Sequence, residues 1–201
     1  GILFDFDWDD GRMNAENCRH QPWGFTGEMV LRLIRRLPGR GYIIVTDNYY
    51  TSLPLARELL LRGHRLLGTI RAARGVPGLV KLPSKRPTRV CPKGTVRSSR
   101  TADNQIYIFS WMDNGPVYLL DTVYGMGWAV VRRREGRQMR EYDVPKGFSA
   151  YNMHMGGVDR YDQIRTGFYG LEMHGRCTKW TVRAYEALFN MALANAFAVF
   201  R

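Results

Sequence analysis

The chain has 201 residues and a formal net charge of +12 at pH 7, from 30 Lys and Arg against 18 Asp and Glu. With 45% hydrophobic residues, it is long enough to bury the core of one domain, or of one domain with a sizeable insertion, so we expect it to fold. Cys18, Cys91 and Cys177 lie far apart without a Cys-x-x-Cys or Cys/His pairing. This argues against a zinc site or a disulfide framework and favours a reduced intracellular compartment.

The first ten residues alternate apolar and acidic positions, which predicts a strand. Because the pattern starts abruptly, with no initiator Met and no secretory signal, we expect the sequence to be a fragment of a longer protein. A helix is predicted to begin at Thr26 or Gly27 and to end at Pro38–Gly39. Its apolar residues recur at helical spacing: Val30, Leu33, Ile34 and Leu37.

A strand–helix–strand unit follows. The apolar run 41–45 predicts a buried strand, and Thr51 or Ser52 is placed to cap a helix that carries Pro54 in its first turn. The run 66–70 predicts the next strand. Short connections between these elements imply parallel pairing and a right-handed crossover, so the sequence predicts an α/β fold.

Two acidic residues are candidate metal ligands. Asp47 directly follows the first of these strands, and Asp159 follows a Gly-Gly pair at the start of a predicted helix, residues 158–166. Carboxylates that converge from remote parts of a chain repel each other unless a divalent cation lies between them. Two alternatives stay open: Asp47 as an ordinary turn residue before a helix, and Asp159 as a helix N-cap.

The excess positive charge is concentrated in one segment. Residues 71–140 hold 14 basic and 4 acidic residues, whereas the rest of the chain holds 16 and 14. Strand-like runs at 106–112 and 117–121 predict a β-hairpin around residues 113–116. We therefore interpret the segment as a small β-rich unit that contacts nucleic acid through a basic face, with a merely solubilising loop as the alternative.

The α/β core is predicted to resume near Pro145 and to close with a long helix at 178–200. Polar and charged residues along that helix argue for packing and against a membrane span. One apolar stripe is predicted to face the core: Val182, Tyr185, Leu188, Phe189, Ala192, Ala196 and Phe197.

A series of motifs along the whole chain resembles the piggyBac transposase family. In order, the motifs are Thr46-Asp47-Asn48-Tyr49-Tyr50-Thr51-Ser52, Leu55-Ala56, Gly68-Thr69-Ile70-Arg71, Tyr151-Asn152, Met155-Gly156-Gly157-Val158-Asp159, Asp162-Gln163, Lys179-Trp180 and Asn195-Ala196. The resemblance implies an RNase H-like core interrupted by a β-rich insertion. It divides the chain into a first part of the core at 1–70, the insertion at 71–140 and the C-terminal helices of the core at 141–201.

The resemblance also implies cut-and-paste DNA transposition with three catalytic Asp residues and Mg²⁺, in a two-metal site in the complete enzyme. Asp47 matches the second catalytic Asp and Asp159 the third, with Asp162 as a further metal ligand. Asn48 is placed to orient Asp47 or a metal-bound water.

Basic residues and one Trp are the expected contacts to double-stranded DNA, both transposon ends and target. They are Arg71, Arg74, Lys85, Arg86, Arg132, Arg133, Arg134, Lys179 and Trp180. Trp180 also suits a helix that packs in a core. The family implies a TTAA target, a homodimer, a nuclear location and no membrane partner.

The family's first catalytic Asp is expected upstream of residue 1, so we predict that this polypeptide by itself does not cut DNA. The sequence leaves open whether the chain is an active enzyme. One alternative function is a domesticated derivative of a transposase that binds DNA or chromatin without catalysis. An unrelated RNase H-like nuclease is a weaker alternative, because it gives no reason for the insertion or for the motif that ends at Asp159.

Overall fold

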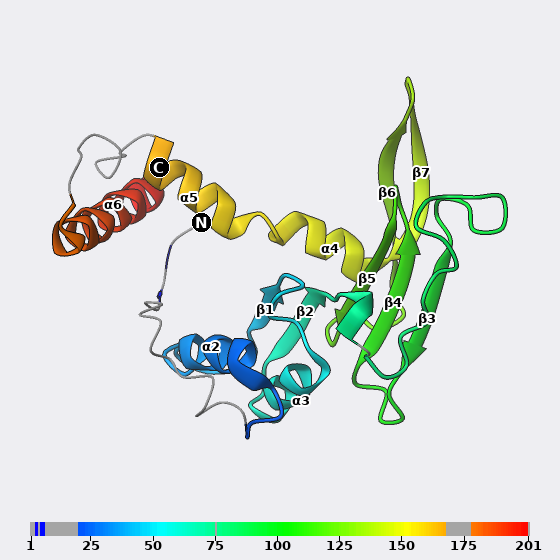
Figure 1. Ribbon diagram of the computed structural model, residues 1–201, viewed down its shortest axis with the longest axis horizontal. Helices are drawn as coiled ribbons and strands as arrows, with labels where there is room; N and C mark the ends of the chain where they lie inside the picture. Colours follow the sequence, from blue (N-terminus) through cyan, green and yellow to red (C-terminus); the bar gives the residue numbers. More distant parts are fainter. Residues whose placement is uncertain (1–2, 4, 7–19, 75, 168–177, 201) are drawn as a thin grey trace. The chain divides into compact units, whose positions relative to one another are not determined.

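The computed structural model describes residues 3, 5–6, 20–74, 76–167 and 178–200 (Figure 1). The strand predicted in the first ten residues lies largely outside the described residues. The chain divides into two compact units, one of residues 8–155 and one of residues 1–7 with 156–201.

The larger unit is built on a five-stranded sheet with the strand order β1-β2-β5-β4-β3. β1 (Ile43–Thr46) and β2 (Arg65–Thr69) are parallel, with Thr46 opposite Gly68. β3 (Val96–Arg100), β4 (Tyr107–Met112) and β5 (Pro116–Asp121) continue the sheet in antiparallel fashion. The predicted β-α-β unit and the predicted hairpin are both confirmed. The division at residue 70 stays a prediction, and strands from both sides of it share this one sheet.

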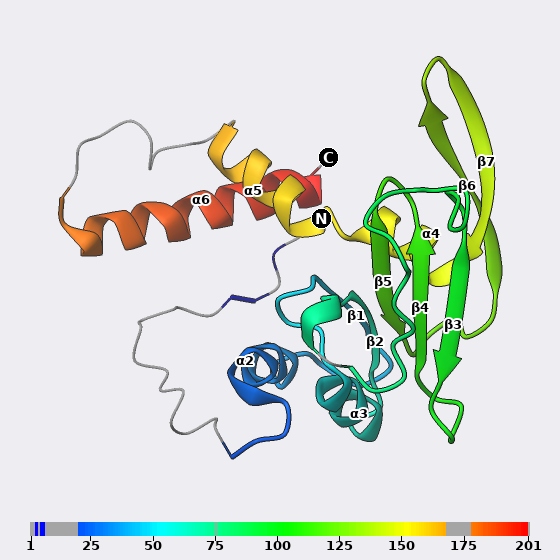
Figure 2. The same cartoon turned by 45° about the vertical axis from the view of Figure 1, so that its right-hand side comes forward.

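Two helices cover one face of this sheet. α2 (Gly24–Ile34) begins two or three residues before its predicted start and ends before Pro38. α3 (Leu53–Leu61) begins as the sequence indicates, because Ser52 Oγ accepts a hydrogen bond of 3.3 Å from the Leu55 amide. Figure 2 shows the two helices beside β1 and β2. Their buried side chains pack with those of the sheet. This cluster includes Leu31, Leu55, Leu59, Leu66, Ile108 and Leu120.

The opposite face is covered by elements that the sequence patterns do not predict individually. β6 (Trp128–Glu135) and β7 (Gln138–Pro145) form a two-stranded antiparallel sheet, and α4 (Lys146–His154) follows it. Their core contains Phe109, Trp111, Leu119, Val131, Val144 and Phe148. Neighbouring strand residues such as Leu119 and Leu120 belong to different clusters, because successive side chains point to opposite faces of a sheet.

The smaller unit contains α5 (Gly157–Gly167) and α6 (Trp180–Phe200). α5 packs on α6 through Tyr161, whose hydroxyl donates to the Met191 carbonyl at 2.9 Å. No helix in the described part of the chain is long and apolar enough to span a membrane.

The predicted core stripe of α6 is wrong. Tyr185 is 68% exposed and Phe189 45% exposed, and the buried residues of the helix are Asn190 and Ala194. Val182, Leu188 and Phe197 are also exposed. The apolar spacing indicates that a face can be buried, but it does not identify a partner, and in the described residues of this unit the helix packs on α5 through another face.

Asp121 is a fully buried carboxylic acid at the end of β5. Its Oδ1 accepts hydrogen bonds from the amides of Val123 and Tyr124, at 2.6 and 3.0 Å, and so shapes the turn that leaves the sheet. Its Oδ2 has no hydrogen-bond partner among the described residues and lies against Gly147 in the first turn of α4. Burial raises the pKa of Asp121 above its ordinary value of 3.8, although the two amide hydrogen bonds act in the opposite direction.

Asp121→Asn is expected to flatten one part of the pH dependence of stability. Because the folded-state pKa is raised, Asp121 stabilises the fold fully when protonated, and this contribution is lost as the pH rises through the folded-state pKa. The free energy of unfolding of the Asn variant, relative to the parent, should therefore increase over the pH range above 3.8, the ordinary pKa of the carboxyl. Urea unfolding across this range measures the difference, and a difference that is independent of pH would contradict the prediction.

Candidate functional site

Asp47 lies at the carboxyl end of β1, where a tight turn holds it. Its Oδ1 accepts a hydrogen bond of 2.9 Å from the amide of Tyr49, and its main-chain carbonyl accepts from the amide and the hydroxyl of Thr51, at 3.1 and 2.6 Å. The turn chemistry weighed as an alternative for Asp47 is therefore present. The side chain is nevertheless exposed at the end of a rigid strand, which is the usual place for a ligand-binding residue in an α/β sheet.

The buried hydroxyl groups of Thr46 and Thr51 stabilise this turn. Thr46 Oγ1 and Thr51 Oγ1 lie 2.8 Å apart, and both side chains are buried. Gly68 of the neighbouring strand leaves room for them, because a Cβ atom at that position would lie 2.2 Å from Thr51 Oγ1 and 2.7 Å from the Thr46 carbonyl oxygen. The two motifs that contain Asp47 and Gly68 thus form one local structure.

Asn48, beside Asp47, contacts Arg71. The Arg71 Nε donates to Asn48 Oδ1 at 2.7 Å, and both residues lie just past the carboxyl ends of the parallel strands β1 and β2. The expectation that Asn48 orients Asp47 stays a prediction, and the hydrogen bond in the structure joins it to Arg71. A basic residue that was expected to bind DNA therefore contacts the residue that follows the candidate metal ligand.

α4 brings the Tyr151-Asn152 motif to the same end of the sheet. The hydroxyl of Tyr151 lies 3.2 Å from Thr69 Oγ1, at the last residue of β2, and Tyr151 is only 7% exposed. Neither this contact nor α4 itself could be derived from the periodicity of the sequence. The Tyr151-Asn152 pair in the motif series is the signal that marks the position.

Asp159 is the third residue of α5 and is exposed in the first helical turn. The N-cap alternative is wrong, because the helix already begins at Gly157. A carboxylate in the first turn is favoured by the helix dipole. Asp162 lies one turn further and accepts from Arg165, at 2.7 Å from Nη2 and 3.1 Å from Nε.

Asp47 and Asp159 belong to different units, and their convergence stays a prediction. Among the described side chains, no group of three or more His, Cys, Asp or Glu residues is gathered closely enough to hold a metal ion. The donor chemistry itself fits, since exposed carboxylate oxygens are the ligands that Mg²⁺ prefers.

Most of the residues expected to bind DNA have exposed side chains. Arg71, Lys85 and Arg86 are exposed, and Lys179 and Trp180 lie exposed at the start of α6; Arg74 lies in the short 3₁₀ helix η1 (Ala72–Arg74). Trp180 is 78% exposed, so its alternative interpretation as a core residue is wrong for the described residues.

The three consecutive arginines of β6 differ from one another. Arg132 and Arg134 point to the solvent, with Arg132 paired to Glu141 at 2.8 Å. Arg133 points to the other face, where its Nε lies 3.0 Å from Asp113 Oδ2 and its guanidinium lies 5.2 Å from the Trp111 ring centre. Arg133 therefore joins the hairpin to the β4–β5 turn, and its contact with DNA stays a prediction.

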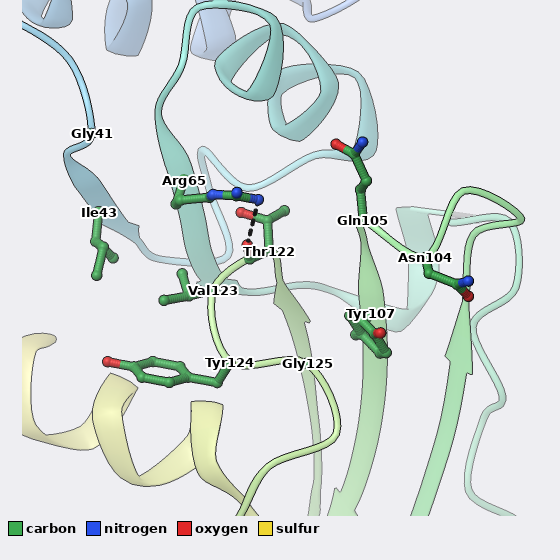
Figure 3. Close-up of a pocket in the computed structure, with 10 residues that line it drawn as sticks. All are labelled: Gly41, Ile43, Arg65, Asn104, Gln105, Tyr107, Thr122, Val123, Tyr124 and Gly125. Atoms are coloured by element: carbon green, nitrogen blue, oxygen red, sulfur yellow. Dashed lines mark hydrogen bonds between the residues drawn. The ribbon is translucent and has the colours of Figure 1, made fainter.

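An open cavity of about 640 Å³ lies at the opposite end of the strands (Figure 3). It is lined by Ile43 and Arg65, near the amino ends of β1 and β2, and Arg65 donates to the Thr122 carbonyl at 3.2 Å. It contains none of the predicted site residues. We therefore place the candidate site at the Asp47 end of the sheet and not in this cavity.

Comparisons with known proteins agree with the motif series. A family model described as Transposase IS4 matches residues 10–197. Human PiggyBac transposable element-derived protein 3 is 27% identical over 188 residues, covering 90% of this chain and 30% of its own length. Human PiggyBac transposable element-derived protein 2 is 25% identical over 209 residues, covering 100% and 34%.

A solved structure shares the fold. The cryo-EM structure of the piggyBac transposase synaptic complex with hairpin DNA is 24% identical, with a TM-score of 0.65, and the match covers 86% of this chain and 33% of that chain. This confirms the α/β class and the RNase H-like core. The chain spans about a third of the length of these proteins.

Gly68→Ala is expected to lower the free energy of unfolding by about 1–3 kcal/mol, because the added methyl group meets the Thr46 main chain, which cannot rotate away. Chemical denaturation measures the change. Gly157→Ala is the control, since nothing lies within 4 Å of its added methyl group, and its effect should stay within about 1 kcal/mol. Equal effects of the two substitutions would contradict the role of Gly68.

Arg133→Ala is expected to destabilise the larger unit by about 1–2 kcal/mol, because it removes an ion pair and a stacked cation and leaves Asp113 with one partner fewer. Arg132→Ala is the matched control. Its ion pair is exposed on both sides, so its effect should stay below about 0.5 kcal/mol. A larger decrease in melting temperature for Arg132→Ala than for Arg133→Ala would overturn this assignment.

Proposed function

We propose that this chain, which belongs to the piggyBac transposase family, is a catalytic-domain portion of a cut-and-paste DNA transposase that performs metal-dependent phosphodiester hydrolysis and strand transfer. One observation carries the proposal. Asp47 follows β1, and Tyr151 of the Tyr151-Asn152 motif contacts the end of the adjacent strand β2 at 3.2 Å. Both motifs thus start from one end of one sheet.

Asp47 and Asp159 are the side chains proposed to hold Mg²⁺, with Asp162 beside them. When bound, Mg²⁺ supplies charge stabilisation to a phosphodiester and lowers the pKa of a water or hydroxyl nucleophile. The chain's own contribution is rigidity: the Tyr49 amide and the Thr51 hydroxyl fix Asp47 at the strand end. Asp159 projects from the first turn of α5.

Double-stranded DNA is the proposed partner. The +10 net charge of residues 71–140 supports this, as do the exposed side chains of Arg71, Lys85, Arg86, Arg132 and Arg134. Lys179 and the exposed Trp180 offer a cation and a stacking surface at the start of α6. A homodimer and a nuclear location complete the proposal for the whole protein.

A DNA- or chromatin-binding protein without catalysis is the second candidate function. It is favoured by the names of the two human relatives, both described as derived from transposable elements. By resemblance, Asp47 and Asp159 correspond to two of the three triad aspartates, and we propose that the isolated chain does not nick DNA. Metal binding separates the two candidates, because a pure DNA-binding protein has no need of a divalent ion at Asp47.

Asp47→Ala and Asp159→Ala are each expected to weaken Mn²⁺ binding to the chain about tenfold or more, as measured by electron paramagnetic resonance. Because both carboxylates are proposed to share one ion, the double substitution should add little to either single one.

Asp143→Ala is the control, since this exposed carboxylate lies in β7 and outside both motifs. If the two substitutions lower Mn²⁺ affinity independently and additively, the two carboxylates do not share one ion. If Asp47→Ala and Asp159→Ala lower Mn²⁺ affinity no more than Asp143→Ala does, the second candidate function is favoured.

A further inference from the structure

Asn48 and Arg71 form a cross-strand contact at the mouth of the candidate site. Each residue lies two positions beyond the last residue of its strand, and the two strands are parallel neighbours. The hydrogen bond between Arg71 Nε and Asn48 Oδ1 measures 2.7 Å, with Asn48 half-buried and Arg71 exposed. The guanidinium is therefore held by Asn48, the residue that directly follows Asp47 in the same turn.

The atoms used in this contact decide what Arg71 offers to a ligand. With Nε engaged by Asn48, the two terminal nitrogens of the guanidinium remain as a pair of parallel donors, which matches the oxygens of a phosphate. The acceptor is a neutral amide, so the contact restrains the side chain without cancelling its positive charge. A carboxylate at position 48 would restrain it equally and would remove the net charge.

We propose that Asn48 is a positioning residue that fixes Arg71 as a phosphate clamp for the DNA backbone beside Asp47. This inference rests on the proposed function and identifies Asn48 as the residue that orients Arg71 for contact with DNA. Asp47 needs no help from Asn48, because the Tyr49 amide and the Thr51 hydroxyl already hold it. Asn48 therefore acts on DNA binding and leaves the metal ligand unchanged.

The test uses the 201-residue chain with a short fluorescein-labelled DNA duplex, read by fluorescence anisotropy across a salt series. Arg71→Ala should make the dependence of log affinity on log salt shallower by about one, as expected for the loss of one phosphate contact. Asn48→Ala should weaken binding roughly fivefold, because the guanidinium keeps its charge and loses its orientation. The double substitution should be no weaker than Arg71→Ala alone.

Two further variants separate orientation from charge. Asn48→Asp keeps an acceptor for Arg71 but neutralises it, so binding should fall at least as far as in Asn48→Ala, with a shallower salt dependence. Gln105→Ala removes an exposed amide at the other end of the sheet, beside the cavity, and should leave DNA binding unchanged. Thermal unfolding of all variants should stay close to that of the parent, since these are surface positions.

Each outcome points to one conclusion. If Arg71→Ala leaves affinity unchanged, the proposed DNA contact at this end of the sheet is wrong, and the role of Asn48 with it. If Arg71→Ala weakens binding and Asn48→Ala does not, the proposed function stands and the positioning role is overturned. If Asn48→Ala instead lowers Mn²⁺ affinity as Asp47→Ala does, then Asn48 serves the metal ligand and the inference fails.

Discussion

The candidate site depends on the close approach of β1 and β2 at Thr46 and Gly68. The Thr46 and Thr51 hydroxyls occupy the space that a side chain at position 68 would need. The same Thr51 hydroxyl donates to the main chain of Asp47. The position of this hydroxyl therefore both requires glycine at position 68 and holds Asp47 in place. Buried hydroxyl groups that bond to each other avoid the cost of unsatisfied polar atoms and make the turn specific.

The basic segment shows why net charge overstates the surface available to a polyanion. Arg133 and Lys93 both pair with Asp113, and each also lies over an aromatic ring, of Trp111 and Tyr142 respectively. These cations hold the β6–β7 hairpin against the larger sheet. Exposed arginines such as Arg71, Arg86, Arg132 and Arg134 remain the stronger candidates for phosphate contacts. The alternation of side chains along β6 separates Arg132 and Arg134 from Arg133.

Local signals in the sequence predicted the part of the fold that surrounds Asp47. Ser52 caps α3 as its residue type and position indicate, and the β-α-β unit follows from short connections between strong patterns. α4 and the β6–β7 hairpin gave no such signal, since α4 is short and contains Gly147, and β6 carries a run of arginines. The apolar stripe of α6 was predicted wrongly, because periodicity does not specify a packing partner. The N-cap left open as an alternative for Asp159 is absent, because residue type does not specify where the first helical turn begins.

Covalent geometry limits how far Asp159 can lie from the end of β2. Tyr151 is fixed at the end of β2, and Asp159 follows it by eight positions, most of which lie in α4 and α5. Helical residues advance the chain by about 1.5 Å each and extended residues by at most about 3.6 Å. Asp159 therefore stays within a distance on the order of 20 Å from Tyr151 in any arrangement of the two units.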